Sequence, residues 1–296
     1  MKYFPKKLTM TWIRNSYKEG SLTPEELAGE IVRRAEKYRD YNIWIVAPDL
    51  KRMMGYIEKL PKDMESLPLW GIPFAVKDNI DVAGSPTTAA CPDYAYDPKE
   101  DAAVVKKLIE AGAFPVGKTN LDQFATGLVG IRSPYGEVKN ALDPELISGG
   151  SSSGSAVSVA LGMAAFSLGT DTAGSGRVPA ALNCLVGYKP SLGAWSTKGV
   201  VPACASLDCV TVFANSLEDA EKVNLAARGV DEECCWSREY KEPLPKLPKK
   251  ICLAKDGVTF YGPYEDIYKA KWEQAKKRIE DMGLSLIHIS EPTRQA

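Results

Sequence analysis

The chain has 296 residues, of which 45% are apolar and 25% are charged, and its formal net charge is −1 at neutral pH. This composition predicts a globular protein that is long enough for one large domain or two ordinary ones. The near-neutral charge gives no electrostatic reason to expect a nucleic acid or an anionic membrane surface as a partner.

The amino terminus favours a cytoplasmic protein, and the cysteines do not indicate a metal site. The first residues, MKYFPKKLTM, lack the apolar run of a secretory signal peptide. The longest apolar stretch, residues 156–169, is shorter than the roughly 20 residues that cross a bilayer. The seven cysteines form no CxxC pair, so they indicate neither a zinc site nor a disulfide framework.

Helices and strands alternate along the chain. Thr23-Pro24-Glu25-Glu26 forms a capping box with proline at the first helical position, so a helix begins there. Further helices are predicted at 49–60, 101–112, 153–162, 216–228 and 263–282, and strands at 42–47, 72–76, 114–116, 164–168 and 251–254. The proline-rich segment 231–249 is predicted to be a surface connection. This alternation predicts an α/β fold with a mixed, largely parallel sheet that helices cover on both faces.

The last residues differ in character from the rest. One set of codons for LSLIHISEPTR, residues 284–294, reproduces a transposase adapter used in sequencing libraries. We therefore interpret 284–296 as a non-native tail and 1–283 as the amino-terminal portion of a single truncated domain. A native strand followed by a loop is the alternative. His288, the only histidine of the chain, lies in this segment.

Two loops rich in glycine and serine flank one predicted helix and strand: GGSSSG, residues 149–154, and GTDTAGSG, residues 169–176. A helix and a strand return the chain to the edge that it left, so both loops are expected at one end of the sheet, where α/β proteins bind ligands. The first loop lacks the lysine of a phosphate-binding GxxxxGK[ST] motif, and the second does not fit GxGxxG. A nucleotide site is therefore not indicated.

Ser175 in the second loop is a candidate nucleophile without a histidine partner. The chain has no GxSxG elbow between a predicted strand and a helix and no histidine before residue 284, so a Ser-His-Asp triad is not supported for 1–283. A lysine serves as the base when desolvation or nearby positive charge keeps it neutral. Lys77, at the end of the apolar strand 72–76, is the best candidate.

Three motifs together resemble the signatures of the amidase signature family: GIPFAVKDNIDVAG, GGSSSGSAVSVA and GTDTAGSGRVPAA. The resemblance covers 20–230. It implies the amidase signature fold and amide hydrolysis by a Ser-cisSer-Lys triad, without a cofactor. In this chain the triad would be Lys77 as the base, Ser151 as the serine after a cis peptide bond, and Ser175 as the nucleophile.

The resemblance also implies a mechanism and further roles. Ser151 would relay the Ser175 proton to Lys77, and Ser175 would form an acyl-enzyme that water then cleaves. Ser153 and Ser152 are expected to cap a helix or support the site, and Ser152 is also a substrate-contact candidate with Gly127. Asp171 and Arg177 are expected to pair and hold their loop, and Asp78 and Asn79 to hold the turn after Lys77. The oxyanion hole would consist of the backbone amides of Thr172, Ala173, Gly174 and Ser175.

Three other stretches resemble the allophanate hydrolase branch of the family: PTTAACPDYAY, TNLDQFATGLVGIRSPYG and VPACASLDCVTVFA. This branch cleaves allophanate to ammonia and carbon dioxide, which implies a urea carboxylase, separate or fused, as a partner. A homodimer is possible, whereas nucleic acid and membrane partners are not expected. The alternatives are the A subunit of a glutamyl-tRNA(Gln) amidotransferase, another amidase, and an inactive truncated fragment.

Overall fold

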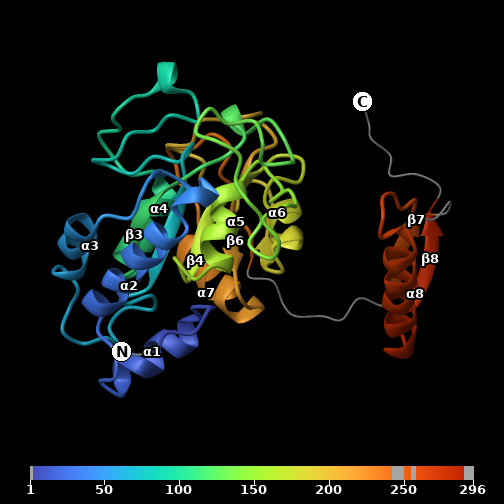
Figure 1. Ribbon diagram of the computed structural model, residues 1–296, viewed down its shortest axis with the longest axis horizontal. Helices are drawn as coiled ribbons and strands as arrows, with labels where there is room; N and C mark the ends of the chain where they lie inside the picture. Colours follow the sequence, from blue (N-terminus) through green and yellow to red (C-terminus); the bar gives the residue numbers. More distant parts are fainter. Residues whose placement is uncertain (1–2, 242–249, 255–257, 290–296) are drawn as a thin grey trace. The chain divides into compact units, whose positions relative to one another are not determined.

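A mixed sheet of six strands organises the first of two compact units, Met1–Tyr240, in a computed structural model that describes residues 3–241, 250–254 and 258–289 (Figure 1). The strand order is β1-β3-β2-β4-β6-β5. The central strands β3, β2 and β4 run parallel, and β1, β6 and β5 pair antiparallel to their neighbours. The strands are β1 (Trp44–Val46), β2 (Pro73–Lys77), β3 (Phe114–Thr119), β4 (Phe166–Asp171), β5 (Val186–Tyr188) and β6 (Cys209–Ala214).

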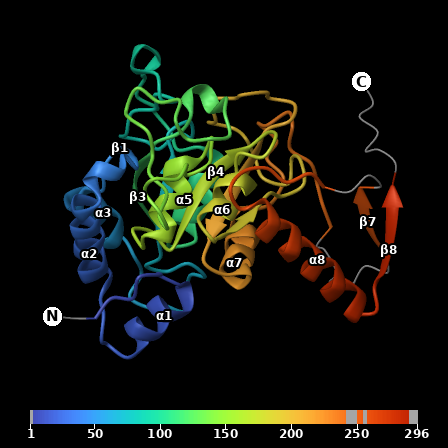
Figure 2. The same cartoon turned by 45° about the vertical axis from the view of Figure 1, so that its right-hand side comes forward.

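Helices cover both faces of this sheet, as predicted. β3 and β4 lie on opposite sides of β2, so the right-handed crossovers β2-α4-β3 and β3-α5-β4 place α4 and α5 on opposite faces. α7 packs beside α4 and against β6, while α2 and α3 lie side by side in both views (Figures 1 and 2). The helices of this unit are α1 (Met10–Lys18), α2 (Pro24–Lys37), α3 (Leu50–Ile57), α4 (Ala103–Glu110), α5 (Ser153–Ala160), α6 (Arg177–Leu182) and α7 (Leu217–Ala227).

Several local predictions are confirmed. The capping box at Thr23 is formed in both directions, because its hydroxyl accepts from the Glu26 amide and the Glu26 carboxylate accepts from the Thr23 amide. Gly112 follows α4 with φ of +95°, the left-handed conformation that ends a helix. Ser216 caps α7 through the Asp219 amide.

The structure corrects the prediction in other places. β4 begins at Phe166 and extends to Asp171, three residues beyond the predicted end, so the GTD motif belongs to the strand. β5, β6, α1 and α6 were not predicted. The prediction ended β4 too early because glycine, at position 169, has a low strand propensity. The structure requires glycine there for packing, since a Cβ would lie 2.6 Å from the Phe213 ring.

The second unit, Lys241–Ala296, contains β7 (Lys250–Ala254), α8 (Glu265–Asp281) and β8 (Ser285–Ile289). β7 and β8 pair in parallel. The predicted strand 251–254 and helix 263–282 are therefore found. β8 lies within the segment that we interpret as a tail, and the boundary at residue 283 stays a prediction. The predicted connection 231–249 lies partly outside the described residues. Among those that are described, no helix is both long and apolar enough to cross a bilayer.

α5 reaches the centre of the first unit because its residues, SGSAVSVA, are small, and all of them are buried. Gly154 sits in its first turn, where a Cβ would collide with the Ile43 carbonyl and lie 2.8 Å from the Asn120 amide nitrogen. Because these obstacles are backbone atoms, Gly154→Ala is expected to lower the free energy of unfolding by roughly 3 kcal/mol or more. Urea denaturation measures this change.

Gly55→Ala in α3 is the matched control, since a Cβ at Gly55 meets no atom within 4 Å. It is expected to stabilise the protein slightly, because alanine favours the helix by about 1 kcal/mol. Equal effects of the two substitutions would contradict the packing argument.

Candidate active site

Lys77 ends β2 in the middle of the sheet, and its side chain is fully buried. Its Nζ lies 2.8 Å from Ser151 Oγ and 2.7 Å from Thr170 Oγ1, and it donates to both. β2 lies between β3 and β4, so the backbone on either side excludes water from the amine. The sheet thus places a lysine amine in contact with the first serine loop, as the sequence predicted.

Burial lowers the pKa of Lys77 from its ordinary value of 10.5 to about 7. The carboxylates of Asp122, Asp208 and Asp171 act in the opposite direction, because a nearby negative charge favours the protonated amine. A large fraction of Lys77 is therefore neutral near pH 7. A neutral amine in contact with a hydroxyl is able to accept a proton from it.

The loop that carries Ser151 is fixed by contacts with the segment after β3. The Gly150–Ser151 peptide bond is cis. The Gly150 amide donates to the Leu128 carbonyl at 2.8 Å, and the Ser151 carbonyl accepts from the Asp122 amide at 3.0 Å. A Cβ at Gly150 would collide with the Asp122 carboxylate, so this position requires glycine.

Ser175 lies in the turn between β4 and α6 and is 5% exposed. Its hydroxyl donates to the Gly127 carbonyl at 3.4 Å, and its own carbonyl accepts from the Ser152 amide at 3.4 Å. The two serine loops therefore meet at one end of the sheet, as expected. Ser151 Oγ is hydrogen-bonded to Lys77 Nζ, and Ser175 Oγ is hydrogen-bonded to the Gly127 carbonyl. The structure therefore shows no hydrogen bond between the hydroxyls of these two described serines.

The Asp171 carboxylate organises the second loop. It accepts from the amides of Gly174 at 2.7 Å and Gly176 at 3.0 Å, and it pairs with Arg177 Nε at 2.9 Å. Burial raises the pKa of Asp171, but the Arg177 hydrogen bond and the two amides outweigh it and hold this pKa well below the usual range. The predicted pairing of Asp171 with Arg177 is confirmed.

The amides of the second loop divide into two groups. The Gly174 amide is occupied by Asp171, so a place for Gly174 in an oxyanion hole would require this hydrogen bond to break. The amides of Thr172, Ala173 and Ser175 donate to no atom of the described residues. These three are free to bind a negatively charged oxygen.

Comparison with known proteins identifies the family of this chain. The Amidase family matches residues 26–295. The chain belongs to the amidase family. The urea amidolyase of Saccharomyces cerevisiae is 48% identical over 253 residues, which cover 84% of this chain and 14% of that protein. The allophanate hydrolase structure from Kluyveromyces lactis superposes with a TM-score of 0.84 at 42% identity, covering 96% of this chain and 47% of the other.

A second kind of relative is also found. The A subunit of the glutamyl-tRNA(Gln) amidotransferase of Lacticaseibacillus paracasei is 39% identical over 236 residues, which cover 77% of this chain and 48% of that protein. This amidase-family chain thus spans less than half the length of each of these three relatives. The similarity to the amidase signature family and to its allophanate hydrolase branch, inferred from the motifs, is confirmed.

Ser152 and Gly127, the predicted substrate contacts, differ in their surroundings. Ser152 occupies the N-cap position of α5, but its hydroxyl makes no capping bond. Instead it donates to the Thr170 carbonyl at 3.1 Å and accepts from the Thr170 amide at 3.3 Å. Ser152 therefore supports β4, the strand that holds a partner of Lys77. The Gly127 carbonyl faces Ser175. Substrate contact by either residue stays a prediction.

Asp78 and Asn79 do more than hold their own turn. Asp78 accepts from the Thr88 amide at 2.9 Å and forms a buried ion pair with Lys118 at 3.3 Å. Asn79 donates to the Val201 carbonyl at 2.9 Å. They tie the turn after the catalytic candidate Lys77 to two of the stretches that resemble the allophanate hydrolase branch, 86–96 and 201–214.

Sequence reasoning missed the acidic residue Asp122. Its carboxylate is fully buried and accepts from the amides of Gly130 at 3.1 Å and Arg132 at 2.8 Å. The available signal was an aspartate at the start of a loop with glycines at 127 and 130, since such aspartates often accept from nearby backbone amides. Thr170 and Asp208 were missed as well, and no local pattern marks them.

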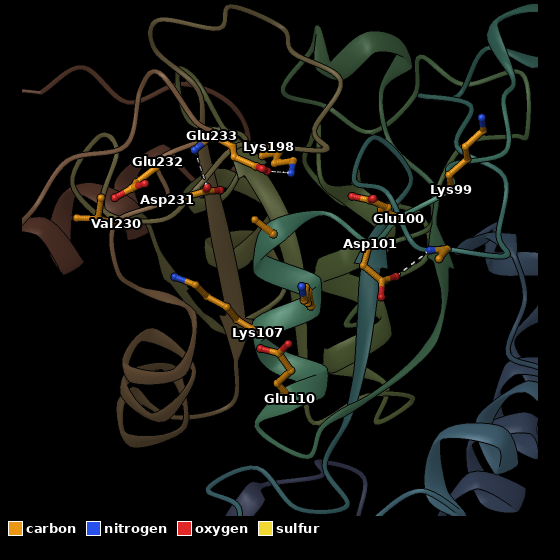
Figure 3. Close-up of a pocket in the computed structure, with 13 residues that line it drawn as sticks. Lys99, Glu100, Asp101, Lys107, Glu110, Lys198, Val230, Asp231, Glu232 and Glu233 are labelled. Atoms are coloured by element: carbon orange, nitrogen blue, oxygen red, sulfur yellow. Dashed lines mark hydrogen bonds and ion pairs between the residues drawn. The ribbon is translucent and has the colours of Figure 1, made fainter.

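A cavity of about 780 Å³ lies apart from these residues, between α4 and the segments around 198 and 230–233 (Figure 3). Its wall carries charges of both signs, and Lys198 pairs with Glu233 in this wall. None of the predicted site residues lines this cavity.

Proposed function

We propose that this chain carries the catalytic residues of an allophanate hydrolase. The observation that carries the proposal is the contact of 2.8 Å between the buried Lys77 amine and Ser151 Oγ, next to the loop of Ser175. A serine nucleophile needs a base, and a lysine with a pKa of about 7 meets this need without a histidine.

The proposed reaction begins with proton transfer. Neutral Lys77 accepts the Ser151 proton as Ser151 accepts the Ser175 proton, so Ser175 Oγ becomes nucleophilic. This step requires the Ser175 hydroxyl to turn from the Gly127 carbonyl towards Ser151. Ser175 Oγ then bonds to the carbonyl carbon of the substrate amide, and the carbon–nitrogen bond breaks. The relayed proton leaves with ammonia, and water cleaves the acyl-enzyme.

The free amides of Thr172, Ala173 and Ser175 would bind the oxyanion of the tetrahedral intermediate. Each such donor is typically worth about 3 kcal/mol of the activation barrier when it is aligned in advance. The Asp171 carboxylate supports this alignment because it holds the amides on either side of Ser175.

The similarity to urea amidolyase and to allophanate hydrolase favours allophanate as the substrate. A urea carboxylase, separate or fused, would then supply it by carboxylating urea. Two alternatives remain. The 39% identity to the A subunit of glutamyl-tRNA(Gln) amidotransferase supports release of ammonia from glutamine for transfer to charged tRNA. The partial coverage of the relatives supports an inactive fragment.

Ammonia release with allophanate, glutamine and a simple aliphatic amide distinguishes these proposals. The chain and the uninterrupted gene product that contains it are assayed in parallel, with the Ser175→Ala variant of each as the blank. Preference for allophanate supports the proposal, and preference for glutamine would replace it with the amidotransferase. Activity of the longer product alone, with non-cooperative urea unfolding of the chain, identifies an inactive fragment.

A further inference from the structure

Thr172 is the first residue of the loop with the free amides, and a residue that does not belong to the predicted triad binds its side chain. Its hydroxyl donates to the carboxylate of Asp208. Asp208 directly precedes β6, whose first residue, Cys209, pairs with Asp171 at the end of β4. The antiparallel pairing of β4 and β6 therefore brings Asp208 beside Thr172, although 36 positions separate them.

Asp208 is buried, and backbone amides occupy the rest of its carboxylate. The Ala203 amide donates to Oδ2 at 2.9 Å, and the Cys204 amide lies 3.1 Å from both oxygens. A carboxylate with two oxygens satisfied in this way has one orientation available. The Thr172 hydroxyl thus binds to an acceptor that is itself fixed.

Thr172 is also held through its carbonyl, which accepts from Lys189 Nζ at 3.1 Å. Two hydrogen bonds therefore hold the peptide group between Thr172 and Ala173. Lys189 binds its carbonyl oxygen, and Asp208 binds the side chain of Thr172. The amides of Thr172 and Ala173 remain without an acceptor in the described residues. Such a loop presents free donors in a fixed direction.

We propose that Asp208 is a positioning residue, which fixes the amides of Thr172 and Ala173 for the oxyanion through the Thr172 hydroxyl. This inference rests on the proposed function of Ser175 as a nucleophile. Asp208 touches neither Ser175 nor Lys77, and no role was assigned to it from the sequence.

The charge of Asp208 provides a readout that a purely structural role would not move. Three carboxylates raise the pKa of Lys77: Asp122 after β3, Asp208 before β6 and Asp171 at the end of β4. Removal of one negative charge lowers the pKa of Lys77, so the amine stays neutral at lower pH. The acidic limb of the pH–rate profile should then move to lower pH.

The test compares Asp208→Asn, Thr172→Val and the double variant. Asp208→Asn removes the charge and weakens the hydrogen bond, whereas Thr172→Val removes the hydrogen bond and leaves the charge in place. Asp219→Asn is the matched control, because Asp219 is a buried aspartate on α7 that accepts from the Met10 amide. Thermal unfolding shows whether each variant is folded.

Two rates are measured. The first is kcat/KM for ammonia release from allophanate between pH 5 and 9. The second is the rate at which a fluorophosphonate labels Ser175: the serine oxygen bonds to phosphorus, fluoride leaves, and the proton passes through Ser151 to Lys77. The phosphoryl oxygen occupies the oxyanion position in this reaction, so labelling reports on the hole without the natural substrate.

We expect Thr172→Val to lower both rates by roughly 10- to 100-fold without moving the acidic limb. Asp208→Asn should lower both rates and shift the limb to lower pH. The double variant should be no slower than the slower single variant, because both substitutions act on the same hydrogen bond between Thr172 and Asp208. The control should match the wild type.

The inference is overturned if Thr172→Val reacts at the wild-type rate, or if the two single effects multiply in the double variant. If Asp208→Asn fails to fold, Thr172→Val decides alone. A wild-type chain that labels but does not hydrolyse allophanate overturns the proposed substrate, and the labelling rates then test Asp208. An uninterrupted gene product that neither labels nor hydrolyses allophanate overturns both proposals.

Discussion

Ser175→Ala is expected to reduce ammonia release by at least about 10⁴-fold, because it removes the atom that we propose forms the acyl-enzyme. The fold should change little. The Ser175 hydroxyl makes one hydrogen bond, at 3.4 Å to the Gly127 carbonyl, and a neutral bond of this length contributes at most about 1 kcal/mol. Steady-state assays and urea denaturation measure the two effects on the same preparation.

Ser167→Ala is the matched control. Ser167 is a buried serine of β4, and its hydroxyl also donates to a backbone carbonyl at 3.4 Å, that of Leu168. This variant loses the same chemical group, from β4 instead of from the turn that follows it, and should keep its activity within about threefold. Retention of more than about 1% activity by Ser175→Ala would assign the nucleophile to another residue.

Lys77→Met is expected to lower kcat/KM by about 10³-fold or more near neutral pH, since no other base contacts Ser151 in the described part of the chain. In the wild type, protonation of Lys77 would abolish the action as a base that we propose for it. Its pKa of about 7 therefore predicts that kcat/KM falls about tenfold for each pH unit below this value. A profile that is flat from pH 5 to 8 would contradict the role of Lys77 as the base.

The same substitution should change the pH dependence of stability. Burial depresses the pKa of Lys77 in the folded state, so between about pH 7 and its ordinary value of 10.5 the unfolded chain binds a proton that the folded chain does not. Stability due to this group therefore rises with pH across this window and levels off above it. Relative to Lys77→Met, the free energy of unfolding of the wild type should gain on the order of 5 kcal/mol from pH 7 to pH 10.5.

Lys118→Met is the control that shows whether the loss of a buried lysine in general gives the same pH dependence of stability as Lys77→Met. Lys118 is also buried, but it forms an ion pair with Asp78 at 3.3 Å. Its removal leaves a buried carboxylate without a counter-charge, which typically costs about 3–5 kcal/mol. Urea denaturation should find this variant destabilised at pH 7.

The prediction for Lys77 is contradicted if the difference in the free energy of unfolding between the wild type and Lys77→Met does not depend on pH. Burial would then not perturb the pKa of Lys77.

Much of the fold and part of the candidate site were predictable because their signals are local. The capping box at Thr23, the end of α4 at Gly112 and the apolar run that ends at Lys77 each depend on residues within one turn or one strand. The meeting of the two serine loops follows from the order of helix and strand alone. The motif resemblance then identified Lys77, Ser151 and Ser175 as a set.

The tertiary structure decided what depends on residues far apart in the chain. Ser152 has the right residue type and position for an N-cap, yet it bonds to Thr170, because β4 offers a buried amide and carbonyl. Asp122 and Asp208 are ordinary loop aspartates until folding surrounds them with unpaired amides. The pKa of Lys77 likewise depends on the strands on either side of β2. Local patterns determine which segments form elements, whereas desolvation and the pairing of buried polar groups are set by neighbours that only the completed sheet brings together.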